Sequence, residues 1–470
     1  MRKKIIIVGG GTSGWFTASW LSKHYDSLDI FLIESKDIPK IGVGESVTPH
    51  VSRFFQELGI NDKEWMQNTG SIYKFANKFV GWKKQNKGED YFGFNYTTAN
   101  KCFIKNEFVP KESKDYFYTS EDIRSCDTLL KLIENKIFDK FDRYFHNAFH
   151  YMEKNVSPFD SEGQYLLDPF FSWSQHINAD LAGDYCRDNI AIPNGVSHLK
   201  SKIIKINKNN ECIESVVLED GQTIEGDIFI DCSGFHRVLM NEIDCKIKEY
   251  KNHSIDSAWV CQLDYEDPEK EMVNYTQSIA QENGWMFKIG LYHRMGTGYC
   301  FSSSHTSSDE AEKYYKKLIK NTRKDPRLLK WTPNRLIDAA KGNVVSIGLS
   351  NGFVEPLEAN NLYMIVTSIK KLKKVLDKYF ISGELNFRDY NKEVGYFIDD
   401  IADFILVHYT LSDRDDSDFW NDSKIVGIKN DHKNLVIDKY HNEENFMMST
   451  IENQSNMFPD YMWGHLASSW

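Results

Sequence analysis

The sequence lacks three features that would each indicate a particular class of protein. None of its eight cysteines forms a CxxC pair, which argues against a zinc ribbon or a dithiol centre and favours a reducing compartment. No apolar run approaches the roughly 18 residues of a membrane helix. Basic residues are the minority, 57 against 68 acidic ones, and the net charge is −11. Nucleic acid is therefore a poor partner for this chain.

The sequence shows no internal repeats and no low-complexity linker, and we expect no signal peptide, because "MRKKIIIVGGG" offers only four consecutive apolar residues. What is present is a chain of 470 residues, 41% hydrophobic and 14% aromatic. This composition indicates a globular protein with a large core. We expect a soluble cytoplasmic protein with no metal site, and its oligomeric state stays open.

The N-terminal pattern predicts a dinucleotide-binding β-α-β unit. A buried strand over 3–8 ends in "GGGTSG", and a helix and a second apolar strand follow. Gly9 allows a tight turn, Gly11 lets a pyrophosphate approach the backbone, and Gly14 lets helix and strand pack closely. Glu34 ends the second strand, where a carboxylate can bind a ribose hydroxyl. The alternative is a glycine-rich turn that binds nothing.

Two later stretches favour FAD over NAD. The apolar runs in "DIFIDCSGFH" (227–236) and "NVVSIG" (343–348) each end near glycine and return the chain to the dinucleotide. Three segments, spread over the chain, are thus expected to contact the dinucleotide, which suits a long cofactor such as FAD. A second glycine-rich fingerprint for NAD(P)H is missing from the sequence. We therefore infer that the flavin is reduced elsewhere and arrives reduced.

The strands lie far apart in sequence, so the predicted fold class is α/β. We expect an FAD-binding, doubly wound sheet of the glutathione-reductase-like kind, with a large inserted substrate region and a helical C-terminal part. The predicted flavin module is discontinuous, with insertions on the substrate side. The boundaries are 1–90, 175–235 and 336–380 for the module, 91–174 and 236–335 for the insertions, and 381–470 for the C-terminal part, helical to 411 and then irregular.

Two further stretches are unusual. "YKFANKFVGW" (73–82) sets a lysine between aromatic residues, and "IGLSNGFVEPLE" (347–358) carries two glutamates in an apolar run that precedes an amphipathic helix. Together with "IIIVGGGTSGW", "KIGVGESVTP", "HINADL" and "DIFIDCSGF", they make the chain resemble the flavin-dependent halogenases of the tryptophan-halogenase type. These motifs run nearly end to end, and we expect the two unusual stretches to belong to one active site.

The resemblance implies a two-part reaction. Reduced FAD and oxygen oxidise a halide to hypohalous acid, which then halogenates an electron-rich aromatic carbon, of the indole or phenol type, through a lysine. A separate flavin reductase supplies FADH2, in agreement with the missing NAD(P)H fingerprint. The resemblance also gives the set of flavin-binding residues: Gly9, Gly11, Thr12, Ser13, Gly14, Glu34, Val43, Glu45, Ile204, Leu349 and Leu362.

Lys74 matches the family's catalytic lysine, and Glu358 matches its active-site glutamate. The lysine would hold hypohalous acid by a hydrogen bond or as a haloamine, and the glutamate would polarise it or take the ring proton. The ordinary alternatives are a lysine with its ammonium group in water and a carboxylate favoured by the positive end of a helix. Lys78 is expected to be solvated and Glu355 to be structural.

The sequence departs from the family at the halide site. Ser-Thr-Gly is replaced by Ala359, Asn360 and Asn361, and we predict that the two asparagines bind the halide at a helix N-terminus. Asn361 is expected to adopt the left-handed backbone of the missing glycine. The change favours bromide or iodide over chloride. In the family's W-x-W-x-I-P motif, Phe287 keeps an apolar wall and Gly290 is expected to loosen the backbone.

The residues that bind the substrate are harder to predict from the sequence. Phe92 and Phe94 are candidates for stacking on the substrate ring, and the aromatic tail over 456–470 is a candidate cap. Free tryptophan, other indoles, phenols and carrier-bound groups all remain possible substrates. A flavin monooxygenase and an FAD-binding protein that has lost its chemistry are the alternatives to a halogenase. Arg414 is expected to pair with Asp415 or Asp416.

Overall fold

The computed structural model describes residues 2–37, 42–83, 91–93, 103–104, 107–108, 152, 154–159, 162 and 173–429. The chain divides into two compact units, each assembled from three separate segments. Unit 1 comprises Met1–Ser71, Ile177–Lys251 and Trp331–Asp399, and unit 2 comprises Ile72–His176, Asn252–Lys330 and Asp400–Trp470.

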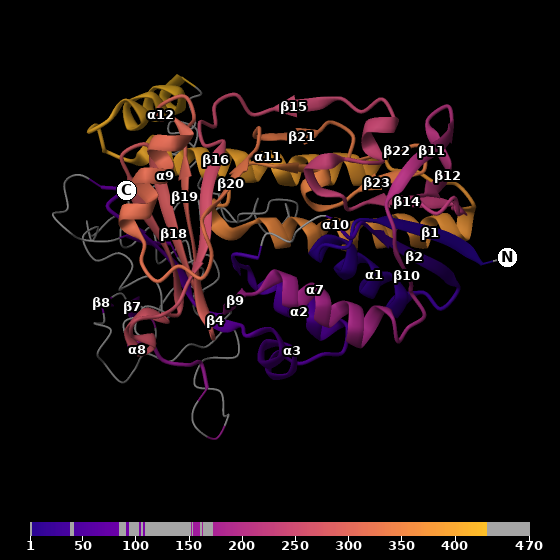
Figure 1. The fold of residues 1–470 in the computed structure, drawn as a ribbon, viewed down its shortest axis with the longest axis horizontal. Helices are drawn as coiled ribbons and strands as arrows, with labels where there is room; N and C mark the ends of the chain where they lie inside the picture. The colour runs from indigo at the N-terminus through magenta and orange to yellow at the C-terminus, as the bar shows by residue number, and fades with distance from the viewer. Residues whose placement is uncertain are drawn as a thin grey trace. The chain divides into compact units, whose positions relative to one another are not determined.

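Unit 1 is built on a six-stranded sheet whose strands come from distant parts of the sequence (Figure 1). Every neighbouring pair is parallel except the last, β23 and β22, which is antiparallel. In spatial order the strands are β10 (Ser197–Lys200), β2 (Leu28–Glu34), β1 (Lys3–Val8), β14 (Ile228–Asp231), β23 (Val344–Ser346) and β22 (Ala340–Lys341). The predicted β-α-β opening and both later returns to the sheet are confirmed.

Both faces of this sheet are covered, which explains why its central strands are apolar throughout. On one face, Ile6 and Val8 pack with apolar residues of a small antiparallel sheet. That sheet consists of β11 (Ile203–Asn209), β12 (Cys212–Leu218) and β13 (Thr223–Glu225), with the predicted turn at "EDG" between the last two. Ile5 and Ile7 point to the opposite face by strand alternation and are fully buried.

Helices complete unit 1. The first, α1 (Thr12–His24), contacts α7 (Ala179–Cys186) and α10 (Asn361–Ser382), and α10 also contacts α2 (Pro49–Glu57). Nine consecutive residues of α1, from 14 to 22, are buried, because neighbours surround the helix. The predicted amphipathic helix is confirmed as α10, whose residues Leu362, Ile365, Ile369, Leu372 and Leu376 are all buried. The remaining elements are α3 (Asp62–Thr69), β3 (Glu45–Ser46), β15 (Ile247–Glu249), β21 (Asn334–Leu336) and β24 (Gly352–Phe353).

Unit 2 is built on a seven-stranded sheet, antiparallel except where β17 and β5 pair in parallel. In spatial order its strands are β20 (Arg327–Lys330), β16 (Ser257–Leu263), β19 (Arg294–Phe301), β18 (Gly284–Leu291), β17 (Tyr275–Gln281), β5 (Ala76–Val80) and β6 (Tyr91–Gly93). Helix α9 (Ser308–Leu318) packs on it through Ala311 and Tyr315. The short elements are α8 (Pro268–Glu271), β4 (Ile72–Lys74), β9 (Ser174–Ile177), β7 (Phe103–Ile104) and β8 (Glu107–Phe108).

The C-terminal prediction was partly wrong. The long helix α11 (Arg388–Leu411) ends where expected, but α12 (Asp418–Lys429) follows where irregular chain was predicted. Aromatic packing overrides the polar sequence here, because Phe419 and Trp420 at the start of α12 are fully buried. Arg414 pairs with Asp416, the second of the two predicted partners, and donates to the carbonyl of Gly81.

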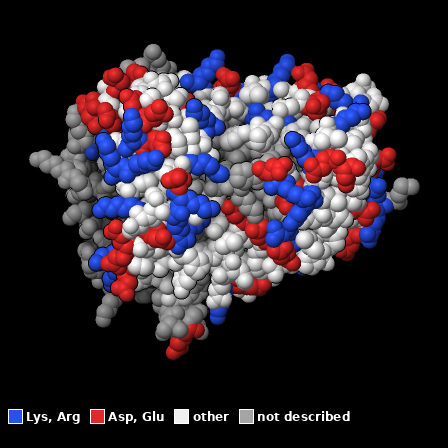
Figure 2. All heavy atoms as spheres, viewed as in Figure 1, with Lys and Arg blue, Asp and Glu red and all other residues white. Residues whose placement is uncertain are grey.

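The surface carries both signs of charge. Figure 2 shows lysine and arginine side chains intermixed with aspartate and glutamate over one face of the molecule. None of the described helices is long and apolar enough to cross a membrane. Phe94 and the tail over 456–470 lie outside the described residues, and Phe92 lies in β6.

Candidate active site

The glycine loop between β1 and α1 has the shape that a dinucleotide requires. A Cβ on Gly9, whose φ is +119°, would lie 2.2 Å from the carbonyl oxygen of Cys232, and one on Gly14 would lie 1.9 Å from that of Gly9. These two glycines therefore serve close packing. Within the part of the chain that the structure describes, no neighbouring atom lies within 4 Å of a Cβ built on Gly11. Open space lies where a pyrophosphate is expected to approach.

The start of α1 is also left available. Gly11 is its N-cap, and the first turn has neither a capping side chain nor an acidic residue. Thr12 is committed elsewhere, since its hydroxyl donates to the carbonyl of Ala179 at 2.9 Å. The backbone N–H groups of the first turn remain for an anion, so this part of the chain fits the phosphates of a dinucleotide.

Glu34 lies against this loop. One carboxylate oxygen is 2.9 Å from Nε2 of His198, and the other lies so close to Gly10 that a Cβ there would be 1.6 Å from it. His198 comes from β10, which pairs with β2. Sequence reasoning missed this histidine because its proximity depends on a strand pairing across more than 160 residues. His198 holds Glu34 at the loop where a ribose hydroxyl is expected.

The other predicted flavin contacts are distributed unevenly in unit 1. Leu349 lies in a 3-10 turn, Gly348–Ser350, which touches Ser13 of α1. Leu362 is fully buried in α10, and Val43 precedes β3. Ile204 lies in the small antiparallel sheet of unit 1. The side chain of Ile204 is 61% exposed, because side chains alternate between the two faces of a strand and the neighbouring Ile203 faces the core.

Asp231, at the end of β14, fixes the chain segment that closes over Gly9. Its Oδ1 accepts from the N–H and hydroxyl of Ser233, and its Oδ2 accepts from the N–H groups of Leu239 and Met240. The residue is fully buried. A single carboxylate thereby satisfies three backbone donors of one loop.

The predicted catalytic Glu358 has an unusual backbone. Its φ and ψ are 67° and 9°, and Ala359 follows with φ of 58°. Two consecutive non-glycine residues in the left-handed region are costly, and such outliers cluster at functional sites. The side chain of Glu358 is 4% exposed, and Glu355 is 3% exposed. The strained pair ends two residues before α10 begins at Asn361.

The prediction for Asn361 was wrong in one respect. Asn361 is the first residue of α10 and has a helical conformation, and Asn360 before it has a φ of −86°. The left-handed positions are Glu358 and Ala359 instead, because the chain reverses before the helix begins. The amide nitrogen of Asn361 lies 3.3 Å from Oε2 of Glu45. Burial raises the pKa of Glu45 to about 7, although the bond from Asn361 opposes the shift.

Lys74, the predicted catalytic lysine, lies in unit 2 at the end of β4 and is completely buried. Its strand pairs with β9, where Ser174 is opposite Lys74 and His176 is opposite Ile72. His176 is buried as well, with Nδ1 donating to the carbonyl of Gly290 at 3.0 Å and Nε2 accepting from Thr276 at 2.8 Å. Burial, reinforced by the charge of Lys74, lowers the pKa of His176 to about 3.

Lys78 and Gly290 both lie in the seven-stranded sheet of unit 2, in β5 and β18. Lys78 is partly buried, and its ammonium group stands 5.7 Å from the centre of the Tyr275 ring. Gly290, whose loosening effect on the backbone stays a prediction, lies within β18. It pairs in register with Met295, and a Cβ there would lie 3.2 Å from the hydroxyl of Tyr265. The space of a side chain is therefore already filled.

Comparison with known proteins settles the class of enzyme. The family model described as tryptophan halogenase matches residues 4–469. The chain belongs to the tryptophan halogenase family. Tryptophan 7-halogenase RebH of Lentzea aerocolonigenes is 31% identical to it, over 90% of this chain and 78% of RebH. Tryptophan 6-halogenase SttH of Streptomyces toxytricini is 28% identical, over 90% of this chain and 81% of SttH.

A solved structure agrees with this assignment. That of Tar14, a tryptophan C-6 flavin-dependent halogenase (chlorinase) from taromycin biosynthesis, superposes with a TM-score of 0.83. It is 25% identical and covers 100% of this chain and 90% of Tar14. The predicted family, the α/β fold class and the enzyme class are therefore confirmed. This halogenase is a flavin-dependent enzyme of the oxidoreductase type.

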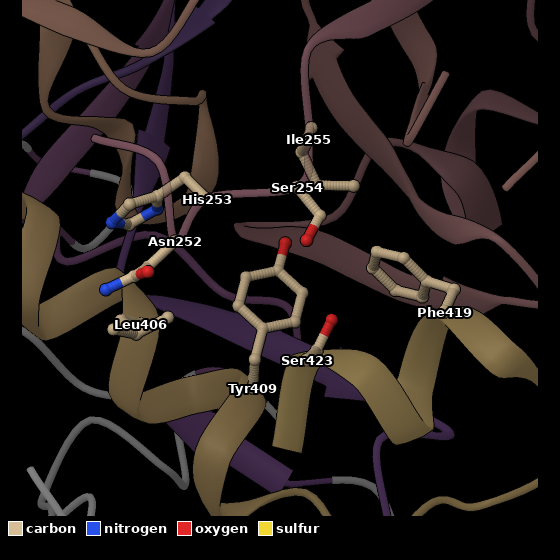
Figure 3. A pocket seen from close by; sticks show the side chains of 8 residues that line it. All are labelled: Asn252, His253, Ser254, Ile255, Leu406, Tyr409, Phe419 and Ser423. Carbon is tan, nitrogen blue, oxygen red and sulfur yellow. The ribbon is translucent and has the colours of Figure 1, made fainter. Parts of the chain in front are cut away.

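One small cavity of the halogenase lies in unit 2, and none of the predicted site residues lines it. It is lined by side chains from the segment before β16 and from α11 and α12, and the hydroxyls of Ser254, Tyr409 and Ser423 point toward it (Figure 3). It has room for about one water molecule. Three hydroxyl groups suit a buried water, so we assign the cavity no part in the chemistry.

The strained backbone of the halogenase leads to a stability prediction. Replacing Ala359 by glycine is expected to raise the free energy of unfolding by about 1 kcal/mol, because glycine adopts a φ of 58° without a steric penalty. Thermal unfolding with the flavin removed measures this change. Ala311→Gly, at a buried position inside α9, is the control and should destabilise instead. An unchanged or lowered midpoint for Ala359→Gly would contradict the strain.

His176 leads to a prediction about pH. An unfolded histidine takes up a proton below its ordinary pKa of 6.5, whereas folded His176 stays neutral down to about pH 3. Stability is therefore lost as the pH falls, by about 2 kcal/mol between pH 6.5 and pH 5. Urea unfolding at both pH values, compared with His176→Gln, isolates this contribution. The exposed His236→Gln should keep the pH dependence of the original protein.

Proposed function

We propose that this halogenase transfers halogen to an electron-rich aromatic carbon, of the indole or phenol type, through Lys74. The observation that carries the proposal is the complete burial of that side chain. A lysine with a structural role normally keeps its ammonium group in water and buries only its stem. An amine held in a dry environment is suited instead to bind hypohalous acid by a hydrogen bond, or to be halogenated itself.

Glu358 is proposed as the residue that polarises the hypohalous acid or takes the proton from the ring. Support comes from its backbone, because a φ of 67° is kept at a carboxylate where glycine would be less strained. Replacing Glu358 by glutamine is expected to lower the halogenation rate about a hundredfold, since the amide accepts no proton. Single-turnover measurements with reduced flavin check this. Glu355→Gln is the comparison, and an equal loss in both variants would contradict a special role for Glu358.

The flavin is proposed to lie along the glycine loop. With oxygen, reduced FAD supplies the oxidising power that converts a halide to hypohalous acid. The N–H groups at the start of α1 would hold its pyrophosphate, and Glu34, oriented by His198, would bind the ribose. Val43, Glu45, Leu349 and Leu362 stay proposed contacts. A separate flavin reductase is the proposed partner, because the sequence has no second dinucleotide fingerprint.

The halide is proposed to bind at the N-terminus of α10, beside Asn360 and Asn361, with bromide or iodide preferred over chloride. A helix of 22 residues offers free N–H groups and the positive end of a dipole there. Oxygen, an aromatic substrate and a halide complete the reaction mixture. Product dominated by chlorine in a competition at equal halide concentrations would contradict the preference.

Product mass spectrometry tests the function. The protein would receive FAD, a flavin reductase, NADH, oxygen and a panel of indoles and phenols that includes free tryptophan, with each halide offered separately. We expect halogenated product that requires the halide. Hydroxylated product without any halogen dependence would indicate a monooxygenase, and consumption of neither flavin nor substrate would indicate a protein that only binds FAD.

A further inference from the structure

A carboxylate stands at the helix end that is proposed to attract the halide. Glu45, from β3, reaches the first residue of α10, where the amide nitrogen of Asn361 donates to its Oε2 at 3.3 Å. The first turn of α10 has no acidic residue of its own. Glu45 therefore supplies the negative charge that the positive end of the helix favours. When ionised, it competes with a halide for the same electrostatic position.

The two asparagines present the wrong atoms for an anion. Asn360 is 3% exposed, and its side-chain oxygen has no hydrogen-bond partner among the described residues. The side-chain oxygen of Asn361 is likewise buried and without a partner there. A buried oxygen without a donor is costly, and it repels a nearby anion. While Asn361 donates one of its two N–H groups to Glu45, this oxygen forms the other arm of the carboxamide and repels an anion beside it.

Rotating the carboxamide of Asn361 by half a turn exchanges these two atoms. Such a rotation is favourable only if Glu45 carries a proton, because the acid then donates its O–H to the asparagine oxygen. The NH2 group of Asn361 is released at the same time and can donate to an anion. One proton on Glu45 thus removes a competing charge and turns an acceptor into a donor.

We propose that Glu45 and Asn361 form a proton-controlled switch for halide binding, in which the halide binds only when Glu45 is protonated. The inference rests on the proposed halide site at the start of α10. It assigns Glu45 a positioning role in halide binding, in addition to its proposed contact with the flavin. The glycine of the family pattern has no side chain to rotate, so the switch is a property of this chain.

The surroundings of Glu45 place the switch near neutral pH. Burial raises its pKa to about 7, and the negative charge of Asp180 on α7 adds to the shift, while the Asn361 bond opposes it. Halide affinity is therefore highest below pH 7 and falls as the pH rises through that value. By linkage, the binding of a halide raises the pKa of Glu45 further.

Bromide binding to the FAD-loaded protein, measured without turnover by 81Br NMR line broadening, tests the switch. The dissociation constant is expected to be about thirtyfold larger at pH 8.5 than at pH 6, as for one linked proton with a pKa near 7. Glu45→Gln should vary less than about threefold over this range, since glutamine always offers a donor. Asn361→Ala should bind bromide weakly at every pH.

Two carboxylate variants refine the test. Asp180→Asn removes the charge that raises the pKa of Glu45, so the affinity should fall at a lower pH. Asp26→Asn makes the same charge change at an exposed position beyond α1 and should leave the profile unaltered. Flavin absorbance and circular dichroism confirm that each variant is folded and loaded.

The outcomes separate the switch from the function on which it rests. An affinity that does not change with pH, or an unchanged profile in Glu45→Gln, overturns the switch even if halogenated product forms. Bromide binding with the expected pH dependence, but no halogenated product from any substrate, supports the switch and overturns the proposed reaction. Absence of bromide binding at every pH overturns both.

Discussion

Replacing Lys74 by alanine is expected to lower halogenated product at least about a thousandfold, while the protein continues to bind FAD and to consume reduced flavin. The residue is fully buried in β4 and is not one of the residues proposed to contact the flavin. Product and oxygen consumption, measured in the same reaction, separate the two functions. A catalase-treated reaction excludes halogenation by hydrogen peroxide in solution.

The variants for this prediction come from the same stretch of sequence. Lys74→Met keeps most of the side-chain volume without the amine, so it distinguishes lost chemistry from a packing defect. Lys78→Ala removes the other lysine of "YKFANKFVGW", which is partly buried over Tyr275. We expect it to retain product formation within a few fold. Equal loss in Lys74→Met and Lys78→Ala would show that the stretch is needed for folding rather than for chemistry.

Replacing Asp231 by asparagine is expected to cost about 3 kcal/mol or more of unfolding free energy and to weaken FAD binding. The carboxylate accepts from Ser233 on one oxygen and from Leu239 and Met240 on the other. An asparagine turns one of those oxygens into an NH2 group that faces N–H donors. At least one pair of buried donors then has no acceptor.

Urea unfolding and flavin retention measure the two effects. Asp227→Asn is the matched control from the other end of β14, where the carboxylate pairs with Lys3 at 2.7 Å near the surface. Exposed pairs of this kind contribute less than about 1 kcal/mol. A small loss in Asp231→Asn, comparable to that of Asp227→Asn, would mean that the loop after β14 is held by other contacts.

Much of the flavin-side fold follows from local patterns. The strands over 3–8, 227–231 and 343–348 were predictable because β-branched runs that end in glycine read as buried parallel strands. Gly9 and Gly14 could be interpreted because each glycine has a separate steric reason. The helix after Asn361 was predictable from apolar residues three and four apart.

Other features depend on contacts that no local pattern reveals. The pairing of Glu34 with His198, and of Glu45 with Asn361, joins residues separated by 164 and 316 positions. The exposure of Ile204 was also not predictable, because one residue of register decides which face of β11 it occupies. The left-handed backbone was expected two or three residues too late, since residue type alone favours asparagine over alanine there.

The burial of Lys74 has a consequence for reactions other than halogenation. An amine that water does not contact is also closed to acylating reagents, which label exposed lysines readily. Lys74 should therefore stay unmodified in the folded protein and become labelled only when its surroundings open. The rate of its labelling, followed by peptide mass spectrometry, then reports how often β4 is uncovered. Hypohalous acid is larger than water. The rate at which β4 is uncovered therefore also sets an upper limit on the rate at which hypohalous acid reaches the amine of Lys74.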